Sequence, residues 1–91
     1  MSQRKAIVSV IGHDQVGIIA KVTNILAEKN VNILDINQTI LNDFFTMMML
    51  VDVTDFENLD ELQHDLSSLG ESLGLTINLQ LAEIFKAMHR V

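Results

Sequence analysis

The stretch VIGHDQVGII, from Val10 to Ile19, carries an apolar strand pattern into an apolar helix pattern through a turn framed by Gly12 and Gly17. A strand that runs directly into a helix is the first half of a β-α unit. A dinucleotide-binding fingerprint would have a third glycine at the position of Asp14. The stretch therefore starts the fold, and it raises the question of which ligand suits a glycine-framed turn with a carboxylate in its middle.

The hydrophobic pattern on either side of this turn predicts a strand, a helix, two strands, a helix and a strand, in that order. We expect the strands at 5–12, 32–41, 44–53 and 76–81, a first helix at 17–30, and a short C-terminal helix at 82–91. A second helix is expected to follow Thr54 and to end before Gly74, with an apolar face of Leu59, Leu62, Leu66, Leu69 and Leu73. Asn30 suits a left-handed helix cap, and Asn42-Asp43 suits a tight hairpin. Thr54 and Glu57 have the spacing of a capping box.

A βαββαβ order with right-handed crossovers places both helices on one face of a four-stranded antiparallel sheet. The sequence therefore predicts the α+β class, with a ferredoxin-like sandwich as its architecture. With 91 residues, no linker and no internal repeat, the chain is expected to form a single domain over 1–91.

The third strand is predicted to be apolar on both faces, although helices can cover only one. One face carries Phe45, Met47, Met49, Val51 and Val53, and the other carries Phe44, Met48 and Leu50. Single exposed apolar side chains are common, which is the simpler alternative. We expect the second set to lie beside Ile36 or Ile40, and a contiguous patch of this kind favours packing against another subunit.

Composition and charge exclude several classes of function. The formal net charge is −6 and the six basic residues are scattered, so direct nucleic-acid binding is not expected. The chain has no cysteine, and its three histidines lack the spacing of metal ligands, so neither a metal nor another cofactor is expected. No apolar window reaches the length of a membrane span or a signal sequence. We expect a cytoplasmic protein that does not bind membranes.

The turn itself suits a zwitterion better than a phosphate. A helix N-terminus attracts anions, but Asp14 would repel a phosphate, and no cation follows until Lys21. The ammonium group of an α-amino acid would instead pair with Asp14, and its carboxylate would meet the helix amides. Asn32, which follows the first helix, is expected at the same end of the sheet, where its amide would add a donor and an acceptor.

Each of these residues also has a purely structural interpretation. Asp14 has the position of a helix N-cap that bonds the Gly17 amide, and the pattern alone favours this alternative. Asn32 fits an ordinary turn residue. His13 is either a solvated loop residue or a ligand contact that responds to pH.

The loop from Gly12 to Ile18, placed between a first strand and a helix in a βαββαβ chain, resembles that of the ACT domain. The segments ILDINQTI, DFFTMMMLVDV and EIFKAMHRV are similar to those of the stand-alone ACT proteins of the UPF0237 family, which resembles the ACT-containing repressor of the glycine cleavage system. Many ACT domains have a proline where this chain has Val16, so its loop is less rigid.

The resemblance implies a regulatory module that binds an amino acid between paired subunits. The candidate ligand-binding residues are Gly12, His13, Asp14, Gly17 and Ile18 of one subunit and Asn32 of its neighbour. With no enzyme or DNA-binding domain in the sequence, the module would act on an unknown partner protein in trans, as a homo-oligomer and most simply as a dimer. The alternative is a ligand-independent regulator that docks an enzyme or a transcription factor through its apolar sheet face.

An enzyme is not expected. Acylphosphatases of similar topology need an arginine in the loop that here contains Asp14, and copper chaperones need paired cysteines. No pairing of a nucleophile with a base is recognisable in the sequence.

Overall fold

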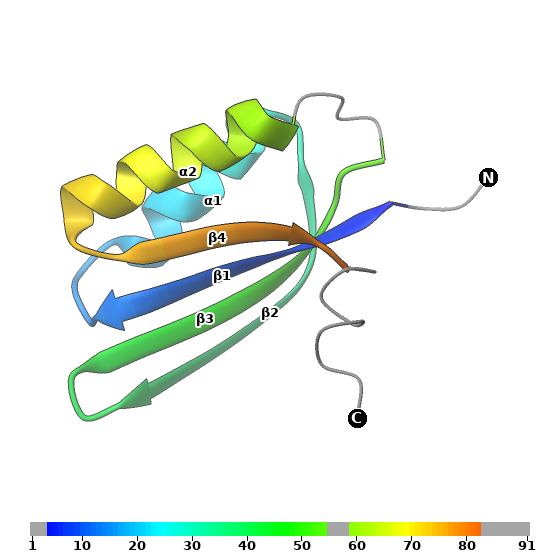
Figure 1. The fold of residues 1–91 in the computed structure, drawn as a ribbon. Helices are drawn as coiled ribbons and strands as arrows, with labels where there is room; N and C mark the ends of the chain where they lie inside the picture. Colours follow the sequence, from blue (N-terminus) through cyan, green and yellow to red (C-terminus); the bar gives the residue numbers. More distant parts are fainter. Residues whose placement is uncertain (1–3, 55–58, 83–91) are drawn as a thin grey trace.

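Two helices lie side by side on one face of a four-stranded antiparallel sheet (Figure 1). The computed structural model describes residues 4–54 and 59–82. In chain order the elements are β1 (Lys5–His13), α1 (Ile18–Glu28), β2 (Asn32–Leu41), β3 (Phe44–Asp52), α2 (Leu59–Leu73) and β4 (Thr76–Leu81). The strands are arranged β2-β3-β1-β4, which confirms the predicted ferredoxin-like βαββαβ fold.

The element ends within the described residues match the predicted ones or differ from them by one or two residues, as is usual for such boundaries. The predicted start of the second helix, directly after Thr54, lies outside the described residues. Asn30 and Asn42 have the predicted positive φ, at 59° and 57°. The capping box is not tested because Glu57 lies outside the described residues, and the same holds for the C-terminal helix beyond Ala82.

The core lies between the sheet and the helices. Its buried side chains come from the helix-facing positions of the strands and from one stripe of each helix. Burial of these apolar side chains is the main stabilising contribution to a domain of this size. On the inner face of α1, Ile18, Val22 and Leu26 are buried and Ile25 packs against the core.

The strand β3 is apolar on both faces, as predicted. Phe45, Met47, Met49, Val51 and Val53 are buried beneath the helices, and Met48 and Leu50 on the uncovered face are half-buried. The expectation that Ile36 or Ile40 joins the second set is wrong. Both isoleucines are paired with helix-facing residues of β3, because the hairpin register sets Ile40 opposite Phe45 and Ile36 opposite Met49.

The edge strand β2 is the least covered element of the sheet. Nine of its ten residues are exposed and Ile33 is half-buried, and Ile36 and Ile40 have exposed fractions of 41% and 52% although they point to the helix side. A bulge interrupts the strand, so that Ile33 lies opposite Val51 and Asp35 opposite Leu50 while Leu34 is the extra residue. Asp35 is the only charged residue of the strand. The strand has no lysine or proline, the residues that commonly prevent an edge strand from pairing with another chain.

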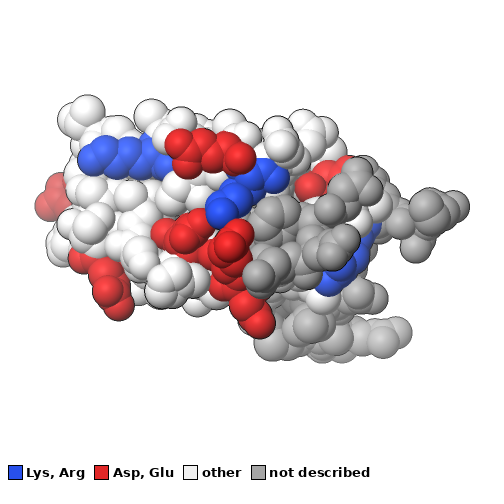
Figure 2. All heavy atoms as spheres, turned by 90° about the horizontal axis from the view of Figure 1, so that it is seen from above, with Lys and Arg blue, Asp and Glu red and all other residues white. Residues whose placement is uncertain are grey.

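Charges on the helix-covered side are intermingled. Seen from above, the basic side chains of the described residues form no continuous patch there (Figure 2). Lys29 follows α1, and its Nζ lies 2.9 Å from Oε1 of Glu61 and 3.2 Å from Oδ2 of Asp65. Both carboxylates belong to α2. These hydrogen bonds raise the pKa of Lys29 above its ordinary value of 10.5. Within the described residues, neither helix has the length and apolar character needed to cross a membrane.

Neighbouring methionines of β3 test the assignment of the two sheet faces. Met47→Ala opens a cavity in the core and should lower the free energy of unfolding by about 2–5 kcal/mol. Met48→Ala removes a half-buried side chain from the uncovered face and should cost clearly less. Urea unfolding followed by far-ultraviolet circular dichroism measures both, since the chain has no tryptophan. Equal losses would contradict the assignment.

Candidate functional site

The loop between β1 and α1 is held in place by backbone geometry. The Asp14 amide donates a hydrogen bond of 2.8 Å to the Asp43 carbonyl, which ties the loop to the β2–β3 hairpin. Gly17 then has φ of 89°, in the left-handed region that favours glycine, and from there the chain turns into the helix. The loop is thus fixed at both of its ends.

Asp14 does not cap the helix. The N-cap residue is Gly17, and no side chain forms a hydrogen bond there. The first intrahelical bond runs from the Lys21 amide to the Gly17 carbonyl at 3.0 Å, so the amides of the first turn precede it and have no partner within the helix. The capping interpretation of Asp14 is therefore wrong, and the exposed carboxylate stands beside the positive end of the helix dipole.

A shallow hollow of about 200 Å³ opens between this loop, the start of α1 and the helix-facing side of β2. Apolar side chains form much of its wall, and Asp14, Gln15 and Gln38 supply polar groups. The full lining is Asp14, Gln15, Gly17, Ile18, Ile19, Ala20, Gln38, Ile40 and Phe45. One carboxylate, helix amides and a small apolar wall are the groups that an α-amino acid would need.

A basic side chain lies closer to the loop than its position one turn into the helix suggests. The Lys21 side chain folds back along the helix, and its Cε lies 3.9 Å from the point where a Cβ on Gly17 would be. Side chains on a helix point toward its N-terminus, so a lysine four residues after Gly17 covers the loop. This rule could have predicted from the sequence that the Lys21 side chain lies near the loop. Gln38 and Ile40 could have been found by counting the hairpin register.

The predicted site residues are only partly brought together. Asp14, Gly17 and Ile18 line the hollow. His13 points to the uncovered face of the sheet, where its ring stacks on Phe44 with centroids 5.8 Å apart. A Cβ on Gly12 would collide with Leu75 Cδ2 and lie 3.3 Å from the Gly74 carbonyl oxygen, so Gly12 accommodates packing rather than ligand approach.

Asn32 lies at the opposite end of the sheet from the loop, and the expectation that it shares the loop's end is wrong. It is paired with Asp52, which is also opposite Lys5 at the start of β1, whereas the loop follows the far end of that strand. The helix α1 runs back along the sheet before β2 begins, so the start of β2 is distant from the start of α1. Asn32 can reach the hollow only from another molecule.

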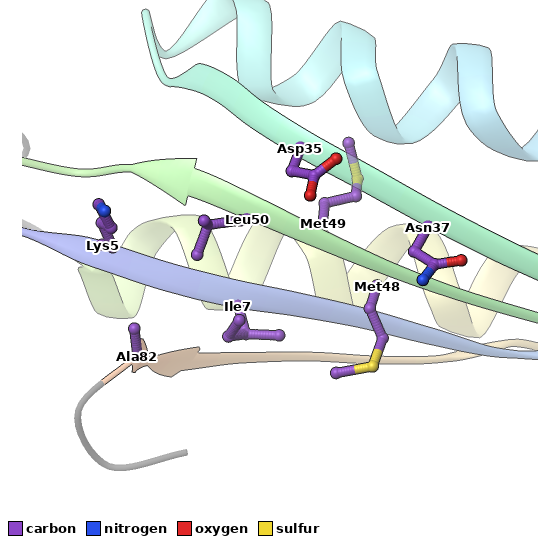
Figure 3. A pocket seen from close by; sticks show the side chains of 8 residues that line it. All are labelled: Lys5, Ile7, Asp35, Asn37, Met48, Met49, Leu50 and Ala82. Atoms are coloured by element: carbon purple, nitrogen blue, oxygen red, sulfur yellow. The ribbon is translucent and has the colours of Figure 1, made fainter. Parts of the chain in front are cut away.

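A larger hollow, of about 390 Å³, lies on the uncovered face (Figure 3). Ile7, Met48 and Leu50 form its apolar floor, Asp35 and Asn37 stand along the β2 side, and Lys5 lies at one end (Figure 3). It lacks both the loop and a helix terminus. Although Lys5 and Asp35 give the larger hollow groups of both charges, we regard the smaller hollow as the candidate site because it adjoins the uncapped N-terminus of α1. Among the residues that the structure describes, no cluster of His, Asp and Glu could hold a metal ion.

Comparison with known proteins agrees with this architecture. A family model described as the ACT domain matches residues 4–80. A UPF0237 protein of Listeria monocytogenes is 47% identical over 88 residues, covering 96% of this chain and 99% of the relative. The solved ACT domain protein from Streptococcus pneumoniae is 40% identical with a TM-score of 0.81, covering 97% and 100% of the two chains. A structure described as a glycine cleavage system transcriptional repressor has a TM-score of 0.78 at 21% identity, over 90% of this chain and 47% of that one, and so shares the fold.

The packing role of Gly12 can be separated from a role in binding. Gly12→Ala forces a methyl group against buried Leu75 and should lower the free energy of unfolding by about 1–3 kcal/mol. Ser9→Ala, on the same strand but on the uncovered face, is the matched control, with a change expected within about 0.5 kcal/mol. Urea titration of both variants is the measurement. A Gly12→Ala variant as stable as the control would show that the close contact is not needed.

Proposed function

Because this chain belongs to the ACT-domain family, and within it to the UPF0237 proteins, we propose that it senses an amino acid at the interface of a homodimer and regulates a partner protein in trans. ACT domains are in general regulatory modules that bind small ligands and oligomerise, and they are not catalysts. The finer statements, that the ligand is an amino acid and that it binds between subunits, rest on the geometry of the hollow.

The observation that carries the proposal is the free carboxylate of Asp14 beside the uncapped N-terminus of α1. The two groups have opposite electrostatic character and lie within one loop, as do the ammonium and carboxylate of an α-amino acid. Lys21, whose Cε lies 3.9 Å from the position that a Cβ on Gly17 would take, adds a positive charge near the helix amides for the ligand carboxylate. A phosphate would meet Asp14 with a charge of the same sign, so the arrangement favours the zwitterion.

The hollow is bounded on one side by Gln38 and Ile40 of the edge strand β2, so a second subunit that pairs with this edge would lie next to it. The free edge of β2 exposes a row of backbone donors and acceptors, and such an edge pairs readily with another strand. An antiparallel pairing of two β2 strands about a two-fold axis sets the beginning of each strand beside the end of the other. The start of β2 of the partner would then reach the loop end of this chain, as the family resemblance implies.

The bulge limits what Asn32 can contribute to that pocket. Residues directly opposite each other point to the same face, so Asn32 shares the uncovered face with Asp52. The hollow lies on the other face, with Gln38 and Ile40. The Asn32 amide would therefore reach a ligand only around the strand edge, and we assign Asp14 the larger share of binding.

Thermal-shift measurements with the standard amino acids, tested singly, examine the ligand proposal. An amino acid at about 100 times its Kd should add about 2.7 kcal/mol to the free energy of unfolding and raise Tm by several degrees. Asp14→Asn keeps the side-chain shape and removes the charge, so the shift should shrink strongly. Asp43→Asn, an exposed carboxylate of the neighbouring hairpin that does not line the hollow, is the control. The proposal fails if no amino acid shifts the wild type.

Two lysine substitutions locate the dimer interface. Ile36→Lys places a charge on the exposed helix-side row of β2 and should convert a dimer to a monomer in light scattering. Ile11→Lys places the same charge on the uncovered face, where Ile11 has an exposed fraction of 47%, and should leave the dimer intact. Dissociation by Ile11→Lys alone would move the interface to the uncovered face, where the apolar pattern of β3 first suggested it.

A second candidate function is favoured by that uncovered face. Leu41 and Phe44 at its hairpin end have exposed fractions of 72% and 57%, and together with Ile11 they form an apolar patch. Contiguous patches of this kind mark protein interaction sites. Under this alternative the chain docks an enzyme or a transcription factor without any ligand.

A pull-down with wild type and Phe44→Asp distinguishes the two candidates. Ligand-independent docking requires a stoichiometric partner whose recovery is the same with and without amino acids and is lost in Phe44→Asp. Recovery that changes with amino-acid supply and is reduced by Asp14→Asn supports the sensor instead.

A further inference from the structure

Gln15 belongs both to the candidate hollow and to the end of α2. Its side chain lines the hollow next to Asp14. Its amide Nε2 also donates a hydrogen bond of 2.9 Å to the carbonyl of Leu73, 58 residues away, in a partly buried contact. A longer contact of 3.4 Å joins the same nitrogen to the His13 carbonyl. One side chain therefore touches the strand end, the pocket wall and a distant helix.

The bond to Leu73 satisfies a group that α2 leaves unpaired. Leu73 is the last residue of that helix, and the last four carbonyls of a helix have no intrahelical partner. The last turn of α2 contains no basic residue that could supply a donor. The Leu75 amide returns to the Gly70 carbonyl at 2.7 Å, which leaves the Leu73 carbonyl free for Gln15. The loop thus supplies a cap for a helix to which it is not joined in sequence.

The same helix end packs on β1 just before the loop. Leu75 occupies the space that the missing Cβ of Gly12 leaves open, and it is buried there. The loop is therefore anchored to the turn between α2 and β4 by a hydrogen bond at Gln15 and by apolar packing at Gly12. A change in loop position must alter both contacts or carry the turn with it.

We propose that Gln15 is a positioning residue that couples occupancy of the hollow to the order of the α2–β4 turn. This inference rests on the proposed ligand site. A ligand that requires the held form of the loop binds most tightly when the bond from Gln15 to Leu73 is made, so it must also stabilise that bond. The coupling is reciprocal: a partner protein that holds the α2–β4 turn in place tightens ligand binding by the same factor. The α2–β4 turn is then the surface at which a partner protein would distinguish the ligand-bound chain from the free one.

Hydrogen exchange with mass spectrometry on the full chain tests this coupling. The probe is the amino acid that gives the largest thermal shift with wild type. In wild type it should slow amide exchange across 72–76 by at least about fivefold, the lower end of typical allosteric couplings. Gln15→Met keeps the side-chain volume and removes the donor. It should abolish this protection and weaken binding by a similar factor.

Gln38→Met is the matched control, because Gln38 lines the hollow but forms no hydrogen bond with α2 in the described structure. It should weaken binding while a saturating ligand still protects 72–76. Without ligand, Gln15→Met should already speed exchange at 72–76 and leave the β2–β3 hairpin unchanged. A rescue variant, Gln15→Lys, restores a donor to the helix end and should recover part of the protection.

The outcomes separate the coupling from the site itself. If an amino acid binds wild type but leaves exchange at 72–76 unchanged, the coupling is overturned and the proposed function stands. If Gln15→Met binds and protects as wild type does, Gln15 has no positioning role. If no amino acid binds wild type, the proposed function and the coupling fail together, and the ligand-free comparison shows Gln15 to be a helix cap alone.

Discussion

The antiparallel pairing of β1 with β3 is the constraint on which the rest of the molecule depends. It runs without interruption from Lys5 opposite Asp52 to His13 opposite Phe44. Because side chains alternate along both strands, this register turns the apolar residues of both central strands toward the helices in phase. The same register sets the β1–α1 loop beside the β2–β3 hairpin, where the Asp14 amide extends the pairing by bonding to Asp43. The candidate hollow exists because these two connections meet.

Much of the fold could be predicted because it follows from local periodicity. Helical spacing and strand alternation identified the six elements and the core face of β3, and Asn30 and Asn42 were recognised from their tolerance of positive φ. The site was harder, since it depends on which element ends meet in space. Counting back from the hairpin would have placed Ile40 on the helix side and Asn32 far from the loop. No local signal could have revealed the contact from Gln15 to Leu73, because it joins segments whose proximity only the finished fold creates.

The two glycines that frame the loop have different structural roles, although the sequence motif suggests a single one. Gly17 provides the left-handed turn into α1, whereas Gly12 leaves room for Leu75 and has no contact with the hollow. Asp14 is held by its backbone, which leaves its side chain free, and Gln15 fastens the loop to α2. The loop is thus held against three neighbouring segments, by the bonds of Asp14 and Gln15 and by the packing of Leu75 on Gly12.

Without the bulge at Leu34, the start of β2 would pair with β3 in a different register. In the observed register Ile33 lies opposite Val51 and Asn32 opposite Asp52. A regular ladder continuing from Asp35 would set Leu34 opposite Val51 and Asn32 opposite Val53, so Asn32 would turn to the helix side. In this second register Leu34 would take the place of its isomer Ile33 on the face of the sheet that packs against the core. In that register the amide of Asn32 would lie on the same face of the sheet as Gln38 and Ile40, so one bulged residue decides which face of the sheet the polar end of β2 serves.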